Sequence, residues 1–556
     1  MAQDASGVWQ AYPRPQLRRD NYVNLNGWWD FAVCDARDLP EGYAHKIQVP
    51  FCPESQLSGV NQQIEPGKYL FYRRHFPRPE GTGKVLLHVG AADQIATIYV
   101  NRKELAVHEG GYTGFTVDIT DALDKNNELV IRCMDDLRSP RLPYGKQRLK
   151  RGGMWYTPVS GIWQTVWLET VPDAYIRSVS IQVDLTAAVI SVTPPLDGRV
   201  LFEGKTIPLV SGAATLSPDC PHHWTPEDPQ LYDFAVEAGE DRVESYFALR
   251  TIEVKTVDGI PRLCLNEKPY FFHGLLDQGY WPEGIYTPET PEAYAVDIST
   301  MKTLGFNTLR KHIKVEPEEF YYLCDKLGMV VFQDMVNNGP YRFLRDTGLP
   351  TVGLKKRRDH RLHRDPASRK AFLTAMEETV TQLKNHPCIL YWTVFNEGWG
   401  QFEADRAYEQ LRALDSSRII DTTSGWFWQT KSDVDSHHIY FGGWKKLKAG
   451  KRPLVLSEFG GLVSPVPGHR FSESKVYGYR LCATAEEFRI RLMQLYRKRV
   501  LPAVPQGLCA AILTQLSDVE EEINGLLTYD RQVIKHDAEA MRPLARDLQK
   551  AITPKG

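Results

Sequence analysis

Two glutamates stand where apolar strands are expected to end. The run ILYWTVF at residues 389–395 leads directly into Asn396, Glu397 and Gly398, and the run LVLS at residues 454–457 leads into Glu458. Burial disfavours a charged side chain at such a position, so each glutamate needs an electrostatic or chemical reason to be there. A structural ion pair is one such reason, and a pair of reactive carboxyl groups is the other.

A pair of carboxyl groups can hydrolyse a glycosidic bond. When the two lie about 5 to 5.5 Å apart across an anomeric carbon, the reaction proceeds through a covalent intermediate with retention of configuration. One carboxyl must be protonated, which burial promotes, and the other must stay ionised through hydrogen-bond donors or a nearby cation. This chemistry needs no cofactor, and the sequence shows no metal-ligand spacing.

The elements that must position these glutamates alternate between strands and helices after residue 256. Strands are expected at 306–310, 329–333, 389–395, 419–422, 438–441, 454–456 and 508–513, and helices at 317–327, 369–384, 404–414 and 485–500. Such alternation over about 300 residues favours a (β/α)8 TIM barrel, in which active residues follow the C-terminal strand ends. Glu397 and Glu458 then lie at strands four and seven. A doubly wound open sheet is the competing fold, but no strand is followed by GxGxxG or a P-loop.

The residues before the barrel have the short apolar alternations and turn signals of β-sandwiches. Strands are expected at 84–89, 95–100, 128–133 and 160–168, and a second β-rich stretch ends in a strand-like run at 247–254. We therefore predict a multidomain β and α/β chain. Its parts are an N-terminal jelly-roll β-sandwich at 1–172, an immunoglobulin-like β-sandwich at 173–255 and the catalytic barrel at 256–556.

Composition narrows the classes of partner. Lys plus Arg total 67 and Asp plus Glu total 69, so the net charge of −2 gives no electrostatic footprint for nucleic acid or an anionic membrane. No apolar run of 18 residues is present, so no transmembrane helix is expected. Residues 1–7 lack a signal-peptide pattern, and the nine scattered cysteines suit a reducing compartment, so we expect a cytoplasmic protein. The expected partner is a carbohydrate.

Several motifs resemble glycoside hydrolase family 2, the family of β-galactosidases, β-glucuronidases and β-mannosidases. The resemblance covers nearly the whole chain. Its motifs are NLNGWWD at 24–30, GIWQ at 161–164, WTPEDPQLY at 224–232, FALR at 247–250, FHG at 272–274, VFNE at 394–397 and SEFG at 457–460.

The resemblance implies a role for individual residues. Glu397 corresponds to the acid/base and Glu458 to the nucleophile, while Asn396 would bind the sugar hydroxyl next to the anomeric carbon. Arg310 matches an arginine that steadies the nucleophile, and Tyr440 matches a tyrosine that contacts it. Members of the family are often homo-oligomers, which nothing in this sequence decides.

Further substrate-binding candidates rest on their positions at strand ends. A stacking role is expected for Trp426, since Gly425 lets the loop turn, whereas each histidine could equally be a structural imidazole. These candidates are Asp277, His312, Asp334, Trp426, His438 and Asp518.

Departures from the family's patterns bear on the substrate. Its β-glucuronidases carry an Asn-x-Lys motif after the last strand, and here Asn524 has no lysine two residues later, which argues against a uronic acid. The stretch RKHI at 310–313 also differs from the SHYP usual in β-galactosidases. We therefore expect a retaining exo-glycosidase of β-galactosidase type that acts on a terminal neutral sugar. The alternatives are a β-galactofuranosidase or α-L-arabinofuranosidase, then a β-glucuronidase or β-mannosidase, and last a carbohydrate-binding protein without catalysis.

Overall fold

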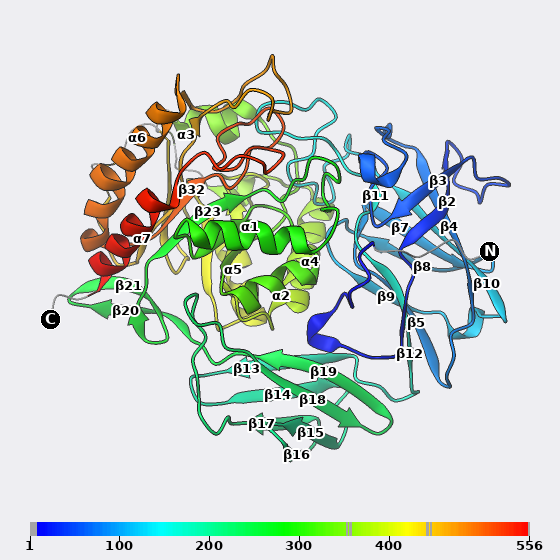
Figure 1. The fold of residues 1–556 in the computed structure, drawn as a ribbon. Coiled ribbons are helices and arrows are strands. Elements are labelled where there is room, and N and C mark those ends of the chain that lie inside the picture. The colour runs from blue at the N-terminus through cyan, green and yellow to red at the C-terminus, as the bar shows by residue number, and fades with distance from the viewer. Residues whose placement is uncertain (1–7, 352–353, 355–357, 441–443, 445–446, 554–556) are drawn as a thin grey trace.

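The computed structural model describes residues 8–351, 354, 358–440, 444 and 447–553. Two β-sandwiches flank a barrel, and Figure 1 shows the first sandwich in blue and cyan, the second in teal and green, and the barrel from green to red. The predicted fold class is therefore confirmed. Residues 1–7, on which the absence of a signal peptide was judged, lie outside the described residues.

The first sandwich packs a six-stranded sheet, of order β3-β2-β4-β10-β7-β8, on a four-stranded sheet of order β1-β12-β5-β9. Alternate side chains of both sheets point inward and form one apolar core. The strands are β1 (Tyr22–Asn24), β2 (Gly27–Cys34), β3 (His45–Val49), β4 (Tyr69–Pro77), β5 (Lys84–Val89), β6 (Ala92–Asp93), β7 (Ile95–Val100), β8 (Lys103–Glu109), β9 (Phe115–Asp118), β10 (Asn126–Met134), β11 (Gly161–Ile162) and β12 (Val166–Val171).

The second sandwich is smaller and has its own core. Its sheets have the orders β13-β14-β17 and β16-β15-β18-β19. The strands are β13 (Ser178–Val183), β14 (Ala188–Thr193), β15 (Gly198–Phe202), β16 (Lys205–Leu209), β17 (Ala213–Leu216), β18 (Tyr232–Ala238) and β19 (Asp241–Phe247).

Eight strands of the described chain form the parallel barrel sheet, of order β27-β26-β25-β24-β23-β32-β29-β28. They are β23 (Phe272–Asp277), β24 (Thr308–Lys311), β25 (Val330–Asp334), β26 (Ile389–Asn396), β27 (Ile419–Ser424), β28 (Asp435–Ile439), β29 (Leu454–Gly460) and β32 (Leu508–Thr514). The edges β27 and β28 meet where Ser424 Oγ lies 2.7 Å from His438 Nε2. Glu397 therefore follows strand four and Glu458 lies in strand seven, as predicted.

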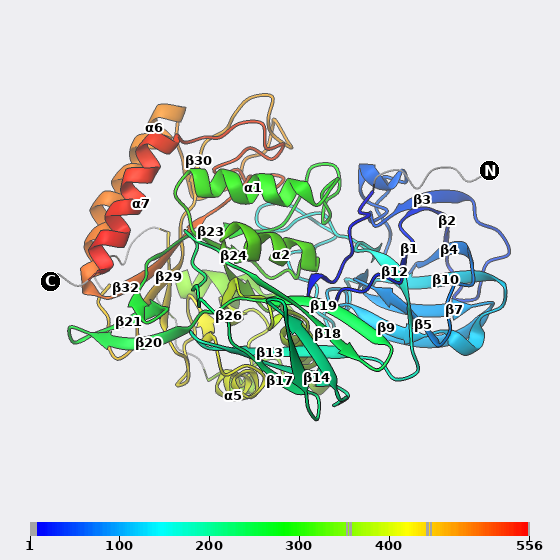
Figure 2. The same ribbon diagram turned by 60° about the horizontal axis from the view of Figure 1, so that its bottom comes forward.

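Helices cover the outside of the barrel. They are α1 (Glu292–Thr303), α2 (Glu318–Leu327), α3 (Leu349–Thr351), α4 (Pro366–Leu383), α5 (Ala404–Leu414), α6 (Ala485–Leu495) and α7 (Ala538–Ile552). Asp365 caps α4 by accepting hydrogen bonds from the backbone of Ala367 and Ser368, with Pro366 in the first turn. Figure 2 shows α6 and α7 side by side over the barrel.

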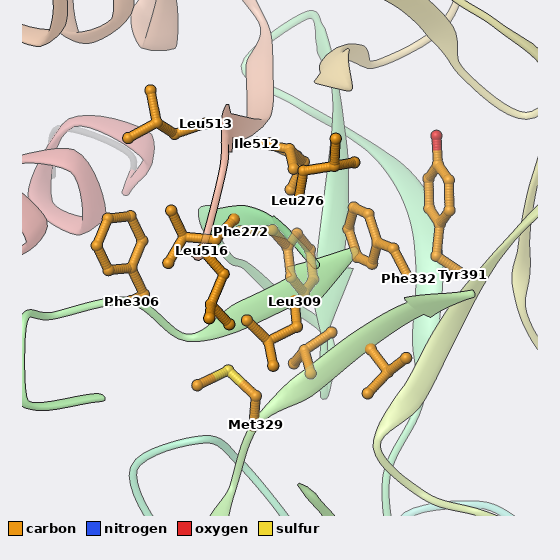
Figure 3. Close-up of a cluster of buried hydrophobic side chains, with 14 of the residues drawn as sticks. Phe272, Leu276, Phe306, Leu309, Met329, Phe332, Tyr391, Ile512, Leu513 and Leu516 are labelled. Carbon is orange, nitrogen blue, oxygen red and sulfur yellow. The ribbon is translucent and has the colours of Figure 1, made fainter. Parts of the chain in front are cut away.

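The barrel interior is a packed apolar core below the strand ends. Phe332 of β25 stacks on Tyr391 of β26, with ring centroids 4.2 Å apart and an interplanar angle of 10°. Figure 3 shows this pair among Phe272, Leu276, Phe306, Leu309, Met329, Ile512, Leu513 and Leu516. Because these side chains fill the interior, polar residues at the strand ends have a rigid base.

Side chains of the sequence motifs join the second sandwich to the barrel. Trp224 is fully buried and donates its indole N–H to the carbonyl of Asp325 at 2.8 Å. Arg250 donates to the carbonyls of Pro387 and Ile389 at 3.1 and 3.3 Å. At the other joint, Arg19 pairs with Glu169 of the first sandwich and Asp241 of the second.

Two predicted strands are interrupted in the structure, and a third ends earlier than expected. The run 160–168 is split because β11 pairs with β6 in a separate two-stranded sheet, whereas β12 pairs with β1 and β5. The run 247–254 is split where Arg250 turns toward the barrel, between β19 and β20 (Ile252–Val257). The strand expected at 438–441 ends at Ile439, and Phe441 lies outside the described residues.

The last strand-like segment of the sandwiches belongs to a small sheet beside the barrel. There β20 pairs with β21 (Ile260–Leu265), and β21 pairs with β22 (Lys268–Pro269). The predicted domain boundaries after residues 172 and 255 stay predictions, and the second falls within β20.

The helix expected at 485–500 is α6 up to Leu495, followed by a wider helical turn. In the described chain, no helix has both the length and the apolarity needed to span a membrane.

Candidate active site

Glu458 lies near the end of β29 and is held by donors on both carboxylate oxygens. The guanidinium of Arg310, at the end of β24, donates from Nη1 to Oε1 at 3.0 Å, and the hydroxyl of Tyr440 donates to Oε2. Burial alone would raise the pKa of Glu458, but the electrostatic influence of His438 and Arg310 outweighs burial and holds it below its usual range. Glu458 is therefore an ionised carboxylate at neutral pH.

Arg310 contacts several other residues of the site. Its side chain is fully buried, and it donates to Asp334 at 2.9 Å and to the side-chain carbonyl of Asn396 at 2.9 Å as well as to Glu458. Asp334 also accepts a 2.8 Å contact from His312 Nδ1. Burial lowers the pKa of His312 to about 4, so the ring is neutral near pH 7. Asp334 and Glu458 both lie beside the buried guanidinium and offset the cost of burying its charge.

Glu397 follows β26 on a tight turn. Its φ of +53° lies in the left-handed region, which is uncommon for a residue other than glycine and marks a constrained position. The turn is closed by a hydrogen bond from Trp399 N to Asn396 O at 2.9 Å, and Glu397 N donates to Ser424 O at 2.9 Å. The glutamate is thus held pointing into the barrel mouth by its own backbone.

His438 lies between the two glutamates. Its Nδ1 is 2.7 Å from Glu397 Oε1, and its Nε2 is 3.6 Å from Glu458 Oε1. This contact fixes the position of the Glu397 carboxyl group relative to the imidazole ring. A strand-end histidine that was equally consistent with a structural role therefore contacts both reactive carboxyl groups.

The spacing of the glutamates suits one class of mechanism. A carboxylate oxygen of Glu397, a ring nitrogen of His438 and a carboxylate oxygen of Glu458 all lie within 4.8 Å of one another. These three atoms could also surround a metal ion, but both ring nitrogens of His438 already contact Glu397 and Ser424. The glutamate separation is close to that of retaining glycosidases and shorter than the range of about 6.5 to 9.5 Å found in inverting enzymes.

A narrow cavity opens at the two glutamates. Its wall includes five predicted site residues, which are His312, Asn396, Glu397, Tyr440 and Glu458. The sequence analysis missed the other residues of the wall, which are Lys146, Met154, Leu276, Gln278, Trp399, Tyr479, Thr514 and Glu522. Two of these, Lys146 and Met154, come from the loop between β10 and β11 of the first sandwich.

Besides Arg310 and His438, four predicted site residues lie outside this wall. Asp277 pairs with Lys311 at 2.6 Å and Asp518 pairs with Lys535 at 2.6 Å, so both carboxylates are occupied by buried lysines. Asp334 lies behind Arg310 and His312. Trp426 donates its indole N–H to the carbonyl of Glu397 at 2.9 Å and so contacts the turn that carries this glutamate; its stacking role stays a prediction.

Part of the missed wall had a signal in the sequence. Gln278 directly follows the strand-end Asp277, Thr514 ends β32, and Trp399 lies two residues after Glu397. The expectation that functional residues follow strand ends therefore identified these segments, but it selected the acids Asp277 and Glu397 and not the nearby Gln278 and Trp399. Lys146 had no such signal, because its position depends on how a loop of another domain docks on the barrel.

The chain is similar to known glycoside hydrolases in sequence and in fold. Residues 260–534 match the family model described as "Glycosyl hydrolases family 2, TIM barrel domain". A β-galactosidase of Thermoanaerobacter pseudethanolicus is 25% identical over 71% of this chain, and a β-glucuronidase of Felis catus is 24% identical over 74%. The match spans 54% of the first relative and 69% of the second. The solved β-D-glucuronidase of Dictyoglomus thermophilum has the same fold, with a TM-score of 0.74, 18% identity and coverage of 97% of this chain and 98% of that one.

Proposed function

Because the chain belongs to glycoside hydrolase family 2, we propose that it is an exo-acting glycosidase that hydrolyses by double displacement, with Glu458 as nucleophile and Glu397 as acid/base. The observation that carries the proposal is the pair itself: two buried carboxyl groups within 4.8 Å, one of them held ionised by an arginine and a tyrosine. Glu458 accepts hydrogen bonds from the arginine and the tyrosine, whereas the carboxyl group of Glu397 contacts His438, and this difference in partners supports different roles for the two residues.

The first step of the proposed reaction breaks the glycosidic bond. An oxygen of Glu458 attacks the anomeric carbon and forms an ester, while Glu397 gives its proton to the departing oxygen. Arg310 and Tyr440 orient the attacking carboxylate, and Asn396 lies beside it in the wall, placed to bind a sugar hydroxyl. The Asn396 carbonyl accepts from Arg310, so its amide N–H₂ is the group that faces the substrate.

The second step hydrolyses the ester. Glu397 now takes a proton from water, which attacks the anomeric carbon and releases Glu458. His438, in contact with Glu397, supplies a polar partner for that carboxyl in both steps. Two inversions at the same carbon give net retention.

Relatives of the chain act on different sugars, as the names β-galactosidase and β-glucuronidase state. The sequence argument for a neutral sugar relied on the missing lysine after Asn524. The cavity wall nevertheless contains a lysine, Lys146, from a distant segment, so that argument no longer excludes an acidic sugar. The loop that carries Lys146 closes one side of the cavity, which suits the binding of one terminal sugar residue.

A panel of aryl glycosides tests the proposal. It contains β-galactopyranoside, β-glucoside, β-mannoside, β-glucuronide, β-galacturonide, β-galactofuranoside and α-L-arabinofuranoside, each assayed with the native protein and with Glu458→Gln. We expect at least one to be hydrolysed by the native protein and a loss of about 10⁴-fold or more in the variant, since the variant cannot form the ester. Hydrolysis that survives in Glu458→Gln would refute the assignment.

A further inference from the structure

The cavity wall contains a cation brought in by the first sandwich. Lys146 lies in the loop between β10 and β11, which Figure 1 shows as a cyan trace reaching the barrel. The loop is fixed on both sides of Lys146. Tyr144 donates from its backbone to Asn337 O at 3.1 Å and from its hydroxyl to Gly339 O at 2.8 Å, and Tyr156 donates its hydroxyl to Glu522 at 2.5 Å. These bonds hold the loop that carries Lys146 against the barrel.

Lys146 has no anionic partner. The residue is only 7% exposed, and no residue of the described chain accepts a hydrogen bond or forms an ion pair with its ammonium. Its nitrogen lies 5.0 Å from the ring centroid of Trp399 and 6.0 Å from that of Tyr156. Cation–π contacts of this kind compensate only part of the cost of burying a charge, so an oxygen acceptor from the cavity would complete the site.

The carboxylate of Glu522, which is influenced by the charge of Lys146, already accepts hydrogen bonds from other residues. Both oxygens of Glu522 accept hydrogen bonds, one from Tyr156 and the other from Asn524 at 3.0 Å. Burial raises the pKa of Glu522, and the charge of Lys146 opposes this effect without forming a pair with it. Glu458 is likewise occupied by Arg310 and Tyr440.

Other atoms of the wall are suited to sugar hydroxyl groups. Gln278 Oε1, Thr514 Oγ1 and Trp399 Nε1 are buried and have no hydrogen-bond partner in the described chain. These are neutral donors and acceptors, which match the hydroxyl groups that every hexose carries. A neutral sugar could satisfy them, but it would leave the charge of Lys146 without a counter-ion.

We propose that Lys146 determines the glycone by binding a carboxylate, so that the preferred substrates are hexuronides rather than neutral hexosides. The inference rests on the proposed function, since it places the acidic sugar with its anomeric carbon at Glu397 and Glu458. An ammonium and a carboxylate form a charge-assisted hydrogen bond, which is stronger than a bond to a neutral hydroxyl. The lysine that is missing after Asn524 is thus replaced, in function, by one from another domain.

The test compares matched pairs of substrates that differ only at the sugar carboxylate. Para-nitrophenyl β-glucuronide is paired with the β-glucoside, and the β-galacturonide with the β-galactoside. kcat/KM is measured for the native protein, Lys146→Gln, Lys146→Arg and the control Lys150→Gln, which removes an exposed lysine from the same loop. We expect the native protein to prefer one uronide over its neutral partner. Lys146→Gln should lose on the order of 10- to 100-fold on that uronide and less than about threefold on the neutral partner. Lys146→Arg should recover part of the loss, and Lys150→Gln should match the native protein.

Several results would overturn the inference. Equal losses on both members of a pair would show that Lys146 supports the fold and does not select the sugar. Preference of the native protein for a neutral glycoside, abolished in Glu458→Gln, would leave the proposed function standing and refute the role of Lys146. If no glycoside is hydrolysed, the proposed function fails, and calorimetric binding of free glucuronate and galacturonate then decides the inference. Binding of either acid that is weakened in Lys146→Gln supports the role of Lys146, and the absence of such binding to the native protein refutes that role. If Lys146→Gln does not fold, the native protein alone is tested by calorimetry with each acid and with glucose or galactose. Tighter binding of the acid than of the neutral sugar supports the inference, and equal binding refutes it.

Discussion

The hydrogen bond from Tyr440 to Glu458 gives a direct way to test the electrostatics of the site. Replacing Tyr440 with phenylalanine removes one hydroxyl and keeps the ring, which stacks on Tyr479 with centroids 4.1 Å apart. The hydroxyl donates to the ionised form of Glu458 only, so its removal destabilises the carboxylate and raises the pKa of Glu458. Arg310 remains in place at 3.0 Å, so the pKa should rise without reaching that of an unpaired buried acid.

The size of the shift follows from the strength of one bond. A hydrogen bond to a charged group contributes about 1.5 to 3 kcal/mol, and about 1.4 kcal/mol corresponds to one pKa unit. We therefore expect the acidic limb of the pH profile of kcat/KM, which reports the free enzyme, to move upward by about one to two units in Tyr440→Phe. The shift is measured with the best aryl glycoside of the panel over the full range in which the protein stays folded.

A matched control separates this effect from general disturbance. Tyr408 donates its hydroxyl to Asp433 at 2.7 Å on the outer side of the barrel, so Tyr408→Phe removes the same kind of bond away from the site. That variant should keep the native profile. An acidic limb that stays in place in Tyr440→Phe, or that moves equally in the control, would show that the Tyr440 hydroxyl does not stabilise the Glu458 carboxylate.

Four other variants test separate parts of the structure. Glu397→Ala should lower kcat/KM by about 10²- to 10⁴-fold for a phenyl glycoside but far less for a dinitrophenyl glycoside, whose leaving group needs no proton; equal losses would remove its role as acid. Gly398→Ala places a Cβ 2.1 Å from the ring of Phe427 at φ +76°, so kcat/KM should fall by more than tenfold, and an unchanged value would show that the turn is not constrained. Trp224→Ala should lower the free energy of unfolding in urea by about 3 to 5 kcal/mol, while a loss under 1 kcal/mol would contradict its role as a joint. Burial raises the pKa of Glu319 to about 8, so its contribution to folding is most favourable below the unfolded pKa of about 4 and is lost as pH rises toward 8; Glu319→Gln should therefore raise the midpoint of thermal unfolding at pH 8 and not at pH 4, and equal midpoints at both pH values would contradict this.

The reactive pair was predictable because two independent regularities coincide there. Strand periodicity placed Glu397 and Glu458 at the ends of buried strands, and the barrel brings all such ends to one face. Arg310 and Tyr440 followed from the resemblance of single motifs, and both contact Glu458 in the structure. A local sequence pattern is sufficient to predict a site residue when its side chain and the strand that positions it are adjacent in sequence.

The surroundings of the reactive pair were not predictable in the same way. Asp277 and Asp518 were chosen because acids at strand ends suggest function, but Lys311 and Lys535 neutralise them in the core. These lysines are 34 and 17 residues from their partners, a pairing that one sequence does not reveal. Lys146 depends on the docking of a sandwich loop on the barrel, which is set by contacts such as those of Tyr144 with residues 337 and 339.

The most direct test of the account is to trap the covalent intermediate. The protein is incubated with the 2-deoxy-2-fluoro dinitrophenyl derivative of its best glycone, which forms the glycosyl ester faster than it releases it, and the adduct is mapped by peptide mass spectrometry. The account predicts one added sugar on the peptide that contains Glu458 and none on the Glu397 peptide, with no adduct in Glu458→Gln. Attachment at Glu397, or turnover of the fluoro sugar to the inverted anomer without any adduct, would contradict the central claim that Glu458 is the nucleophile of a retaining glycosidase.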